Sequence, residues 1–193
     1  MVSRPALFID RDGTLTEEVG YVNHPRRLRL LPRSAEAVRR LNDADVPAVV
    51  VTNQAGIARG YFSADVLAAV NNELLRQLKE SGAYVDGLYV CTHHPSAGEP
   101  PYRDSCDCRK PRPGLLTRAA GELALDLSRS AVVGDRPSDV ETAARVGARG
   151  VLVLTGYGLG EWEYRRATFS VPPDHVAGDL LDAVEWFLAR RQA

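Results

Sequence analysis

The stretch Leu7-Phe8-Ile9-Asp10-Arg11-Asp12-Gly13-Thr14-Leu15 decides the fold. Its apolar run predicts a buried strand over residues 6–10 that ends on an acid. Two carboxylates then stand two residues apart, and such a pair repels unless a cation or a shared proton relieves it. Asp12-Gly13 alone is as typical of a turn, so the interpretation depends on what the rest of the chain adds.

Short apolar runs alternate with amphipathic stretches along the remaining chain. The further strands are predicted over residues 46–52, 87–91, 131–134 and 151–154, and the helices over 34–44, 63–81, 113–125, 137–146 and 179–190. Ser34 is the expected N-cap of the first helix. This alternation predicts an α/β fold with a doubly wound, Rossmann-like parallel sheet and helices on both faces. Because each connection holds about one helix, we expect one domain, residues 1–193, without a cap domain.

Composition excludes several function classes. The 193 residues carry 24 Lys and Arg against 25 Asp and Glu, a net charge of -1, so no basic excess favours nucleic acid as a partner. The apolar runs are too short to cross a bilayer, and charges from Arg4 onward interrupt any signal-peptide core. We therefore expect a soluble, cytoplasmic monomer that acts on a small molecule, with no membrane partner.

Polar residues follow several of the predicted strands. In a parallel sheet the carboxyl ends of the strands meet at one edge, where ligands bind. This edge would gather Asp10 and Asp12, Thr52, Asp135, and Lys110, which is one of only two lysines among 24 basic residues. Carboxylates with a phosphate suit Mg²⁺, and an Asp can form an aspartyl-phosphate. The sequence thus indicates phosphoryl chemistry.

Four ordered motifs resemble those of the haloacid dehalogenase-like phosphatases: Asp10-Arg11-Asp12-Gly13-Thr14, Val51-Thr52-Asn53-Gln54, Arg109-Lys110-Pro111 and Gly134-Asp135. The resemblance implies Asp10 as nucleophile and Asp12 as general acid and base. It implies that Thr52 and Lys110 hold the phosphoryl oxygens, and that Asp10, Asp12 and Asp135 bind Mg²⁺. Asp139 is open between supporting this site and capping the next helix.

All three cysteines lie within one short window, with histidines beside the first. The set Cys91, His93, Cys106 and Cys108 suits a tetrahedral, structural Zn²⁺ that closes a loop over residues 91–108. His94 could replace His93, and a disulfide is the alternative that a cytoplasmic chain disfavours. The loop leads into Arg109 and Lys110, so zinc would fix the phosphate-binding cation.

A zinc loop at this place narrows the resemblance to two groups, the D-glycero-D-manno-heptose 1,7-bisphosphate phosphatases and the histidinol-phosphate phosphatases. Gly20-Tyr21-Val22 and Gly56-Ile57-Ala58-Arg59-Gly60 resemble the heptose group more closely. Arginine forks beside a phosphate site suit a second anionic group. The expected substrate-binding residues are Glu18, Val19, Gly20, Tyr21, Asn53, Gln54, Arg109 and Arg136.

The predicted function is a Mg²⁺-dependent phosphomonoesterase, a hydrolase of carbohydrate metabolism that removes the C7 phosphate of heptose 1,7-bisphosphate. Histidinol phosphate or another small phosphate ester is the alternative substrate. Two other classes are a zinc-stabilised binding module with an inactive core and a phosphotransferase. The balanced charge and the complete set of acidic motif residues argue against the binding module. A phosphotransferase needs a site that excludes water, usually through a cap domain, and we expect no cap domain in this chain.

Overall fold

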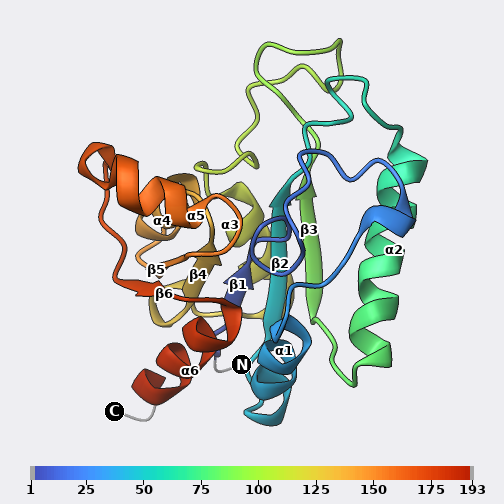
Figure 1. Ribbon diagram of the computed structural model, residues 1–193. Helices are drawn as coiled ribbons and strands as arrows, with labels where there is room; N and C mark the ends of the chain where they lie inside the picture. The colour runs from blue at the N-terminus through green and yellow to red at the C-terminus, as the bar shows by residue number, and fades with distance from the viewer. Residues whose placement is uncertain (1–2, 192–193) are drawn as a thin grey trace.

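The computed structural model describes residues 3–191, which fold around one six-stranded parallel sheet (Figure 1). The strand order is β3-β2-β1-β4-β5-β6. Central β1 pairs with β2 and β4 in register, with Phe8 opposite Val49 and Val132. The strands are β1 (Leu7–Ile9), β2 (Ala48–Asn53), β3 (Gly87–Cys91), β4 (Ala131–Gly134), β5 (Arg149–Val153) and β6 (His175–Ala177).

Helices cover both faces of this sheet, which confirms the doubly wound, Rossmann-like prediction. One face packs against α1 (Ser34–Asp43), α2 (Ala64–Glu80) and α6 (Leu180–Arg191). The other packs against α3 (Gly114–Leu123) and α4 (Pro137–Ala144). Short elements complete the chain: η1 (Pro25–Arg27), η2 (Leu127–Arg129), α5 (Gly158–Gly160), η3 (Glu161–Arg165) and η4 (Arg166–Thr168).

The alternation of side chains along β1 explains why its sequence has no polar residue. Leu7 and Ile9 belong to the apolar cluster under α1, α2 and α6, whereas Phe8 belongs to the one under α3 and α4. Successive strand residues point to opposite faces, and all three are fully buried. Burying such a side chain stabilises the fold by roughly 1.5–3 kcal/mol. A strand covered on both sides therefore needs a continuous apolar run.

One predicted helix cap was wrong, and one strand was not predicted. Ser34 does not cap α1: Arg33 occupies the cap position with φ 63°, and Ser34 is the first residue of the helix, buried, its Oγ without a hydrogen-bond partner among the described residues. The sixth strand, β6, which has only three residues, was not predicted. By contrast, Gly82 and Gly147 follow α2 and α4 with φ of +71°, as expected of glycines that end helices.

The carboxyl ends of the strands point to the top of Figure 1, and the loop between β3 and α3 projects beyond them. Within residues 3–191, no cap domain is inserted between the strands. In that same range no helix has both the length and the apolar character needed to cross a membrane. The site beyond the sheet is therefore bordered by loops.

Candidate active site

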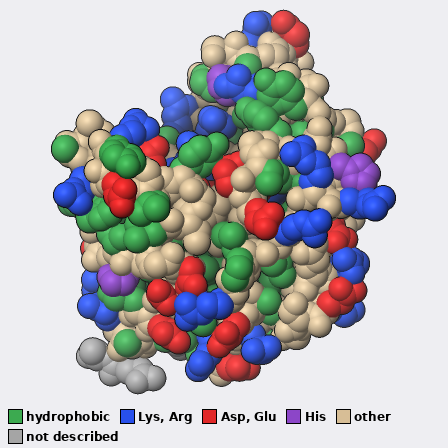
Figure 2. Space-filling model, in the orientation of Figure 1, with side chains coloured by type: hydrophobic (Ala, Val, Ile, Leu, Met, Phe, Trp, Pro, Cys, Tyr) green, Lys and Arg blue, Asp and Glu red, His purple; other side chains and the backbone are tan. Residues whose placement is uncertain are grey.

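A cavity of about 450 Å³ opens at the carboxyl ends of β1, β2 and β4. Figure 2 shows Lys and Arg side chains in the hollow between the projecting loop and the main body, with acidic side chains close below. The cavity is lined by Asp10, Asp12, Glu18, Gly20, Tyr21, Thr52, Asn53, Gln54, Ala55, Arg59, Arg109, Lys110, Arg136, Ser138, Asp139 and Tyr157. The cavity lining thus contains Asp10, Asp12, Thr52 and Lys110, which the sequence predicted at this edge, and it does not include Asp135.

Asp10 follows β1 directly and has one oxygen engaged and one free. Its Oδ1 accepts hydrogen bonds from the Arg11 backbone N–H at 2.8 Å and from Lys110 Nζ at 2.8 Å. No hydrogen bond to Oδ2 occurs within residues 3–191. Burial raises the pKa of Asp10 to about 6, against the opposing effect of Lys110. This carboxylate is oriented, weakly solvated and available through Oδ2.

Asp12 is held by a fully buried guanidinium. Arg11 Nε donates to Asp12 Oδ1 at 3.0 Å and Nη2 donates to Oδ2 at 2.9 Å, while Nη1 donates to Asn71 Oδ1 of α2 at 3.0 Å. Gln54 Nε2 adds a hydrogen bond to Asp12 Oδ2 at 2.6 Å. Bidentate arginine–carboxylate pairs fix geometry as well as charge. Arg11 belongs to the first sequence motif, but the resemblance implied no role for this residue.

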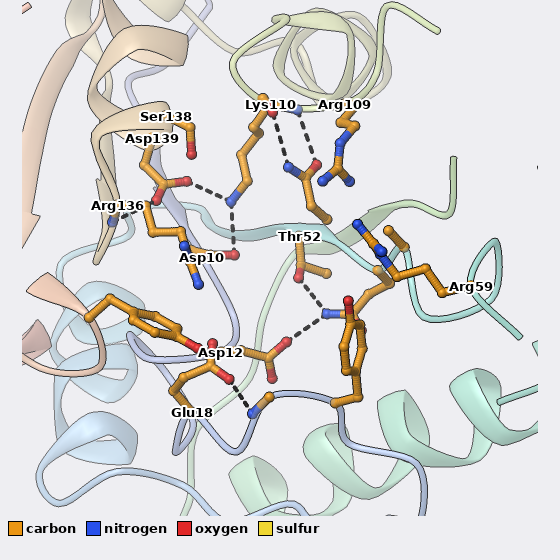
Figure 3. A pocket seen from close by; sticks show the side chains of 16 residues that line it. Asp10, Asp12, Glu18, Thr52, Arg59, Arg109, Lys110, Arg136, Ser138 and Asp139 are labelled. Carbon is orange, nitrogen blue, oxygen red and sulfur yellow. Dashed lines mark hydrogen bonds and ion pairs between the residues drawn. The ribbon is translucent and has the colours of Figure 1, made fainter. Parts of the chain in front are cut away.

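Lys110 Nζ has three oxygen partners, two of which, the carboxylates of Asp10 and Asp139, are drawn in Figure 3. It contacts Asp10 Oδ1 at 2.8 Å, Asp139 Oδ1 at 2.7 Å and the carbonyl of Val51 at 2.9 Å. Burial lowers the pKa of Lys110, but Asp10 and Asp139 outweigh it and hold the pKa above its ordinary value. The side chain of Asn53 also forms two hydrogen bonds with the backbone of Lys110. Its Oδ1 accepts from the N–H of Lys110 at 3.0 Å, and its Nδ2 donates to the carbonyl at 3.1 Å. Lys110 is therefore a fixed positive charge.

Three buried carboxylates gather beside this lysine. Oxygens of Asp10, Asp135 and Asp139 lie within 4.8 Å of one another. Asp135 Oδ2 accepts the backbone N–H of Tyr157 at 2.8 Å, whereas the buried Oδ1 has no partner among the described residues. Burial, with a further contribution from Asp10, raises the pKa of Asp135 to about 8. Clustered, poorly compensated carboxylate oxygens fit a hard divalent cation such as Mg²⁺.

The structure does not place the Asp12 carboxylate in that acidic group. Its oxygens face Arg11 and Gln54 instead. Asp139, which the sequence left open, lies where both interpretations place it. It belongs to the acidic group, and its Oδ2 accepts the backbone N–H of Arg136 at 3.2 Å at the start of α4.

Two glycines allow the acids to approach this closely. A Cβ on Gly13, which has φ +81°, would lie 2.1 Å from Asp135 Oδ2. A Cβ on Gly134 would lie 2.2 Å from the carboxylate of Asp139. Any other residue at either position would push a candidate cation ligand out of place. The glycine of the first motif thus accommodates a neighbouring carboxylate.

The second candidate metal site lies in the projecting loop. The ligand atoms of Cys91, His93, Cys106 and Cys108 lie within 4.8 Å of one another. His93 Nδ1 is 3.3 Å from Cys108 Sγ, and the Sγ atoms of Cys91 and Cys106 are 3.6 Å apart. Three sulfurs and one imidazole nitrogen at such distances fit tetrahedral zinc. The His94 ring lies outside the set and contacts Arg59.

Of the expected substrate-binding residues, all but Val19 line the cavity; Val19 packs against the core. Four lining residues were not predicted from the sequence: Ala55, Arg59, Ser138 and Tyr157. Arg136 stacks on the Tyr157 ring at 3.8 Å, and Tyr157 belongs to the tail beyond the last motif. No pattern in that tail indicated the site.

Comparisons with known proteins agree with this geometry. The family model described as HAD-hydrolase-like matches residues 107–183. The D-glycero-D-manno-heptose-1,7-bisphosphate 7-phosphatase of Thermosynechococcus vestitus is 43% identical over 189 residues, 95% of each chain. The corresponding Escherichia coli phosphatase is 40% identical and aligns with 80% of this chain and 81% of its own.

Solved structures give the same result. The D,D-heptose 1,7-bisphosphate phosphatase of B. bronchiseptica, complexed with magnesium and phosphate, matches with a TM-score of 0.85 and 34% identity, over 96% of this chain and 99% of its own. The resemblance drawn from four short motifs is thereby confirmed along almost the whole length. The chain belongs to the haloacid dehalogenase-like hydrolases, in the family of the D-glycero-D-manno-heptose-1,7-bisphosphate 7-phosphatases.

Proposed function

We propose that this protein is a Mg²⁺-dependent phosphomonoesterase that removes the C7 phosphate of D-glycero-D-manno-heptose 1,7-bisphosphate through an aspartyl-phosphate on Asp10. The observation that supports it best is the free Oδ2 of Asp10, on a carboxylate whose Oδ1 is bound by Lys110 and which belongs to the acidic group. The named activity of the relatives supplies the substrate. A nucleophile with a positioned cation is what covalent phosphoryl transfer requires.

In the first step, Asp10 Oδ2 attacks phosphorus and the ester oxygen leaves with a proton from Asp12. In the second step, Asp12 takes a proton from a water molecule that attacks the phosphoryl group, so that phosphate leaves and Asp10 is regenerated. Thr52 and Lys110 hold phosphoryl oxygens during both steps. Mg²⁺, when bound by Asp10 and Asp135, would neutralise phosphoryl charge. Asp12 suits proton transfer because Arg11 and Gln54 fix its direction.

Zinc in this proposal is structural. A closed set of three thiolates and one imidazole has no open coordination position for chemistry. Its effect on the site would pass through Arg109, because Arg109 Nη1 donates to the carbonyl of His93 at 3.3 Å. Holding His93 therefore holds the arginine that precedes Lys110.

The preference for a bisphosphate rests on unpaired arginines at the cavity. Arg109 and Arg136 both line it, and within the described chain neither forms an ion pair with a carboxylate. A guanidinium without an acidic partner matches a phosphate group in geometry and charge. We also propose that the chain is one domain, which its single sheet from β3 at one edge to β6 at the other supports. We propose in addition that the protein is a cytoplasmic monomer.

The test is a substrate panel of heptose 1,7-bisphosphate, fructose 1,6-bisphosphate and histidinol phosphate, ranked by kcat/KM in Mg²⁺. We expect the heptose bisphosphate to rank first, and ³¹P NMR to show loss of the C7 signal while the C1 signal remains. A higher kcat/KM for histidinol phosphate would replace the proposed substrate. If none of the esters releases phosphate, the hypothesis of a binding module with an inactive core would replace that of a phosphatase.

A further inference from the structure

Arg59 lines the cavity but has no part in the proposed chemistry. We propose that Arg59, together with His94 of the projecting loop, binds the distal phosphate of the substrate, the one that is not cleaved. This inference rests on the proposed function and extends its site outward. Figure 3 shows Arg59 on the opposite side of the cavity from Arg136 and Asp139, as a second anion site for an extended molecule requires.

The two residues come from neighbouring loops that are packed together. Arg59 follows β2 and is held by its backbone N–H, which donates to the carbonyl of Ala55 at 3.0 Å. His94 follows β3. The loops meet where Gly98, with φ +78°, leaves room for Ala58: a Cβ on Gly98 would lie 2.0 Å from the Ala58 carbonyl oxygen. Arg59 and His94 are thus brought together by backbone packing.

The hydrogen bonds of the His94 ring show that the facing atoms of His94 and Arg59 lack a hydrogen-bond acceptor. Its Nδ1 accepts the backbone N–H groups of Ser96 at 3.2 Å and Ala97 at 3.0 Å. A neutral ring that accepts at Nδ1 has its proton on Nε2. That Nε2 lies 2.8 Å from Arg59 Nη2, and a guanidinium has donors only. Two donors therefore face each other, and an anion beside them would accept from both.

The charges around the pair agree with an anionic ligand. Arg59 has no ion pair with a carboxylate anywhere in residues 3–191. Arg103, an exposed arginine of the projecting loop, is by contrast neutralised by Glu99 at 3.3 Å. Arg109 lines the same cavity as Arg59, and its Nη1 donates to the carbonyl of His93, the residue before His94, at 3.3 Å. A second guanidinium without a carboxylate partner therefore borders the same cavity.

The experiment compares substrates that differ in the distal phosphate only. For Arg59→Ala we expect kcat/KM on heptose 1,7-bisphosphate to fall by about 10- to 100-fold, mainly through KM, because a charged hydrogen bond is lost. On heptose 7-phosphate the loss should stay below about twofold. Arg59→Lys should recover part of the loss. His94→Phe, checked for unchanged zinc content, should act in the same direction, and Arg103→Ala is the matched control.

Product inhibition separates the two phosphate subsites. Heptose 1-phosphate should inhibit Arg59→Ala about tenfold more weakly than it inhibits the unaltered enzyme, whereas inhibition by inorganic phosphate at Asp10 should not change. Equal losses on both substrates, or weaker inhibition by inorganic phosphate, would place Arg59 at the reacting phosphate and overturn the inference. Unchanged kinetics on both substrates would overturn it as well. If the unaltered enzyme does not prefer the bisphosphate, the proposed function itself fails.

Discussion

Asp10 and Asp12 are the same residue type two positions apart, yet their surroundings give them different chemistry. Asp10 shares one oxygen with Lys110 and keeps the other free, with a pKa raised to about 6 by burial. Asp12 has both oxygens bound by Arg11. A nucleophile needs a free oxygen, and a proton-transfer group needs a fixed direction. The structure therefore supports the order of roles that the motif implies.

Asparagine substitutions should separate these roles. Asp10→Asn should abolish turnover, because the amide cannot form the aspartyl-phosphate. Asp12→Asn should slow turnover by about 10²- to 10⁴-fold, the usual contribution of acid–base catalysis. Steady-state phosphate release measures both, with circular dichroism to verify folding. Near-normal activity of Asp10→Asn would rule out the covalent mechanism.

Arg11 should act through Asp12 alone. In Arg11→Lys a single ammonium cannot reproduce the two parallel N–H···O bonds, so we expect kcat to fall about tenfold or more with little change in KM. In the Asp12→Asn background the same substitution should add almost nothing, because interacting pairs are non-additive. Arg76→Lys, on an exposed arginine of α2 paired with Glu73, is the control. Additive losses would show that Arg11 acts independently of Asp12.

At the scale of elements, the sequence predicted what strands bring together and missed what loops bring together. Asp10, Thr52 and Asp135 could be placed at one edge because parallel strands share a direction. Arg59 and Tyr157 could not, since their positions depend on how loops fold back over that edge. Ser34 was a reasonable cap by residue type, but the left-handed conformation of Arg33 shifted the helix start. At this helix start, the backbone conformation of Arg33 outweighs the capping preference of serine.

The projecting loop is the element whose order should depend on a metal. Protein purified without added zinc should contain about one Zn²⁺ per chain. Cys106→Ser should lower zinc content and reduce kcat/KM about tenfold or more, the usual range for losses around a metal site, because the carbonyl that Arg109 binds is released.

Ser105→Ala, a change at an exposed neighbour, should keep both zinc and activity. Elemental analysis and kinetics on the same samples check the link between metal and rate. A zinc-free Cys106→Ser protein with full activity would separate the loop from the chemistry.

At the scale of the whole molecule, one sheet edge collects charges from distant parts of the chain. Asp10, Lys110 and Asp139 form one buried ion cluster, although they come from the end of β1, the segment before α3 and the first turn of α4. Such a cluster is costly to desolvate unless its charges compensate one another. Asp135 adds a third carboxylate beside Asp10 and Asp139. Three carboxylates against one lysine leave an excess of negative charge, which a divalent cation would remove. The fold is thus predicted to be more stable with Mg²⁺ than without it.

This stabilisation can be measured as a melting temperature. Mg²⁺ at about 100 times its Kd should stabilise the fold by about 2.7 kcal/mol, and a chain of this size melts about 2–4 °C higher per kcal/mol. The expected rise is therefore roughly 5–11 °C.

Asp135→Asn should start from an equal or higher melting temperature, because a buried carboxylate with an unpaired oxygen is gone, but this variant should lose most of the rise in melting temperature with Mg²⁺. Asp104→Asn, on an exposed acid of the projecting loop, should keep the whole rise. If Asp135→Asn also kept it, Asp135 would not be a magnesium ligand, and the excess negative charge of the cluster would have to be balanced by another means.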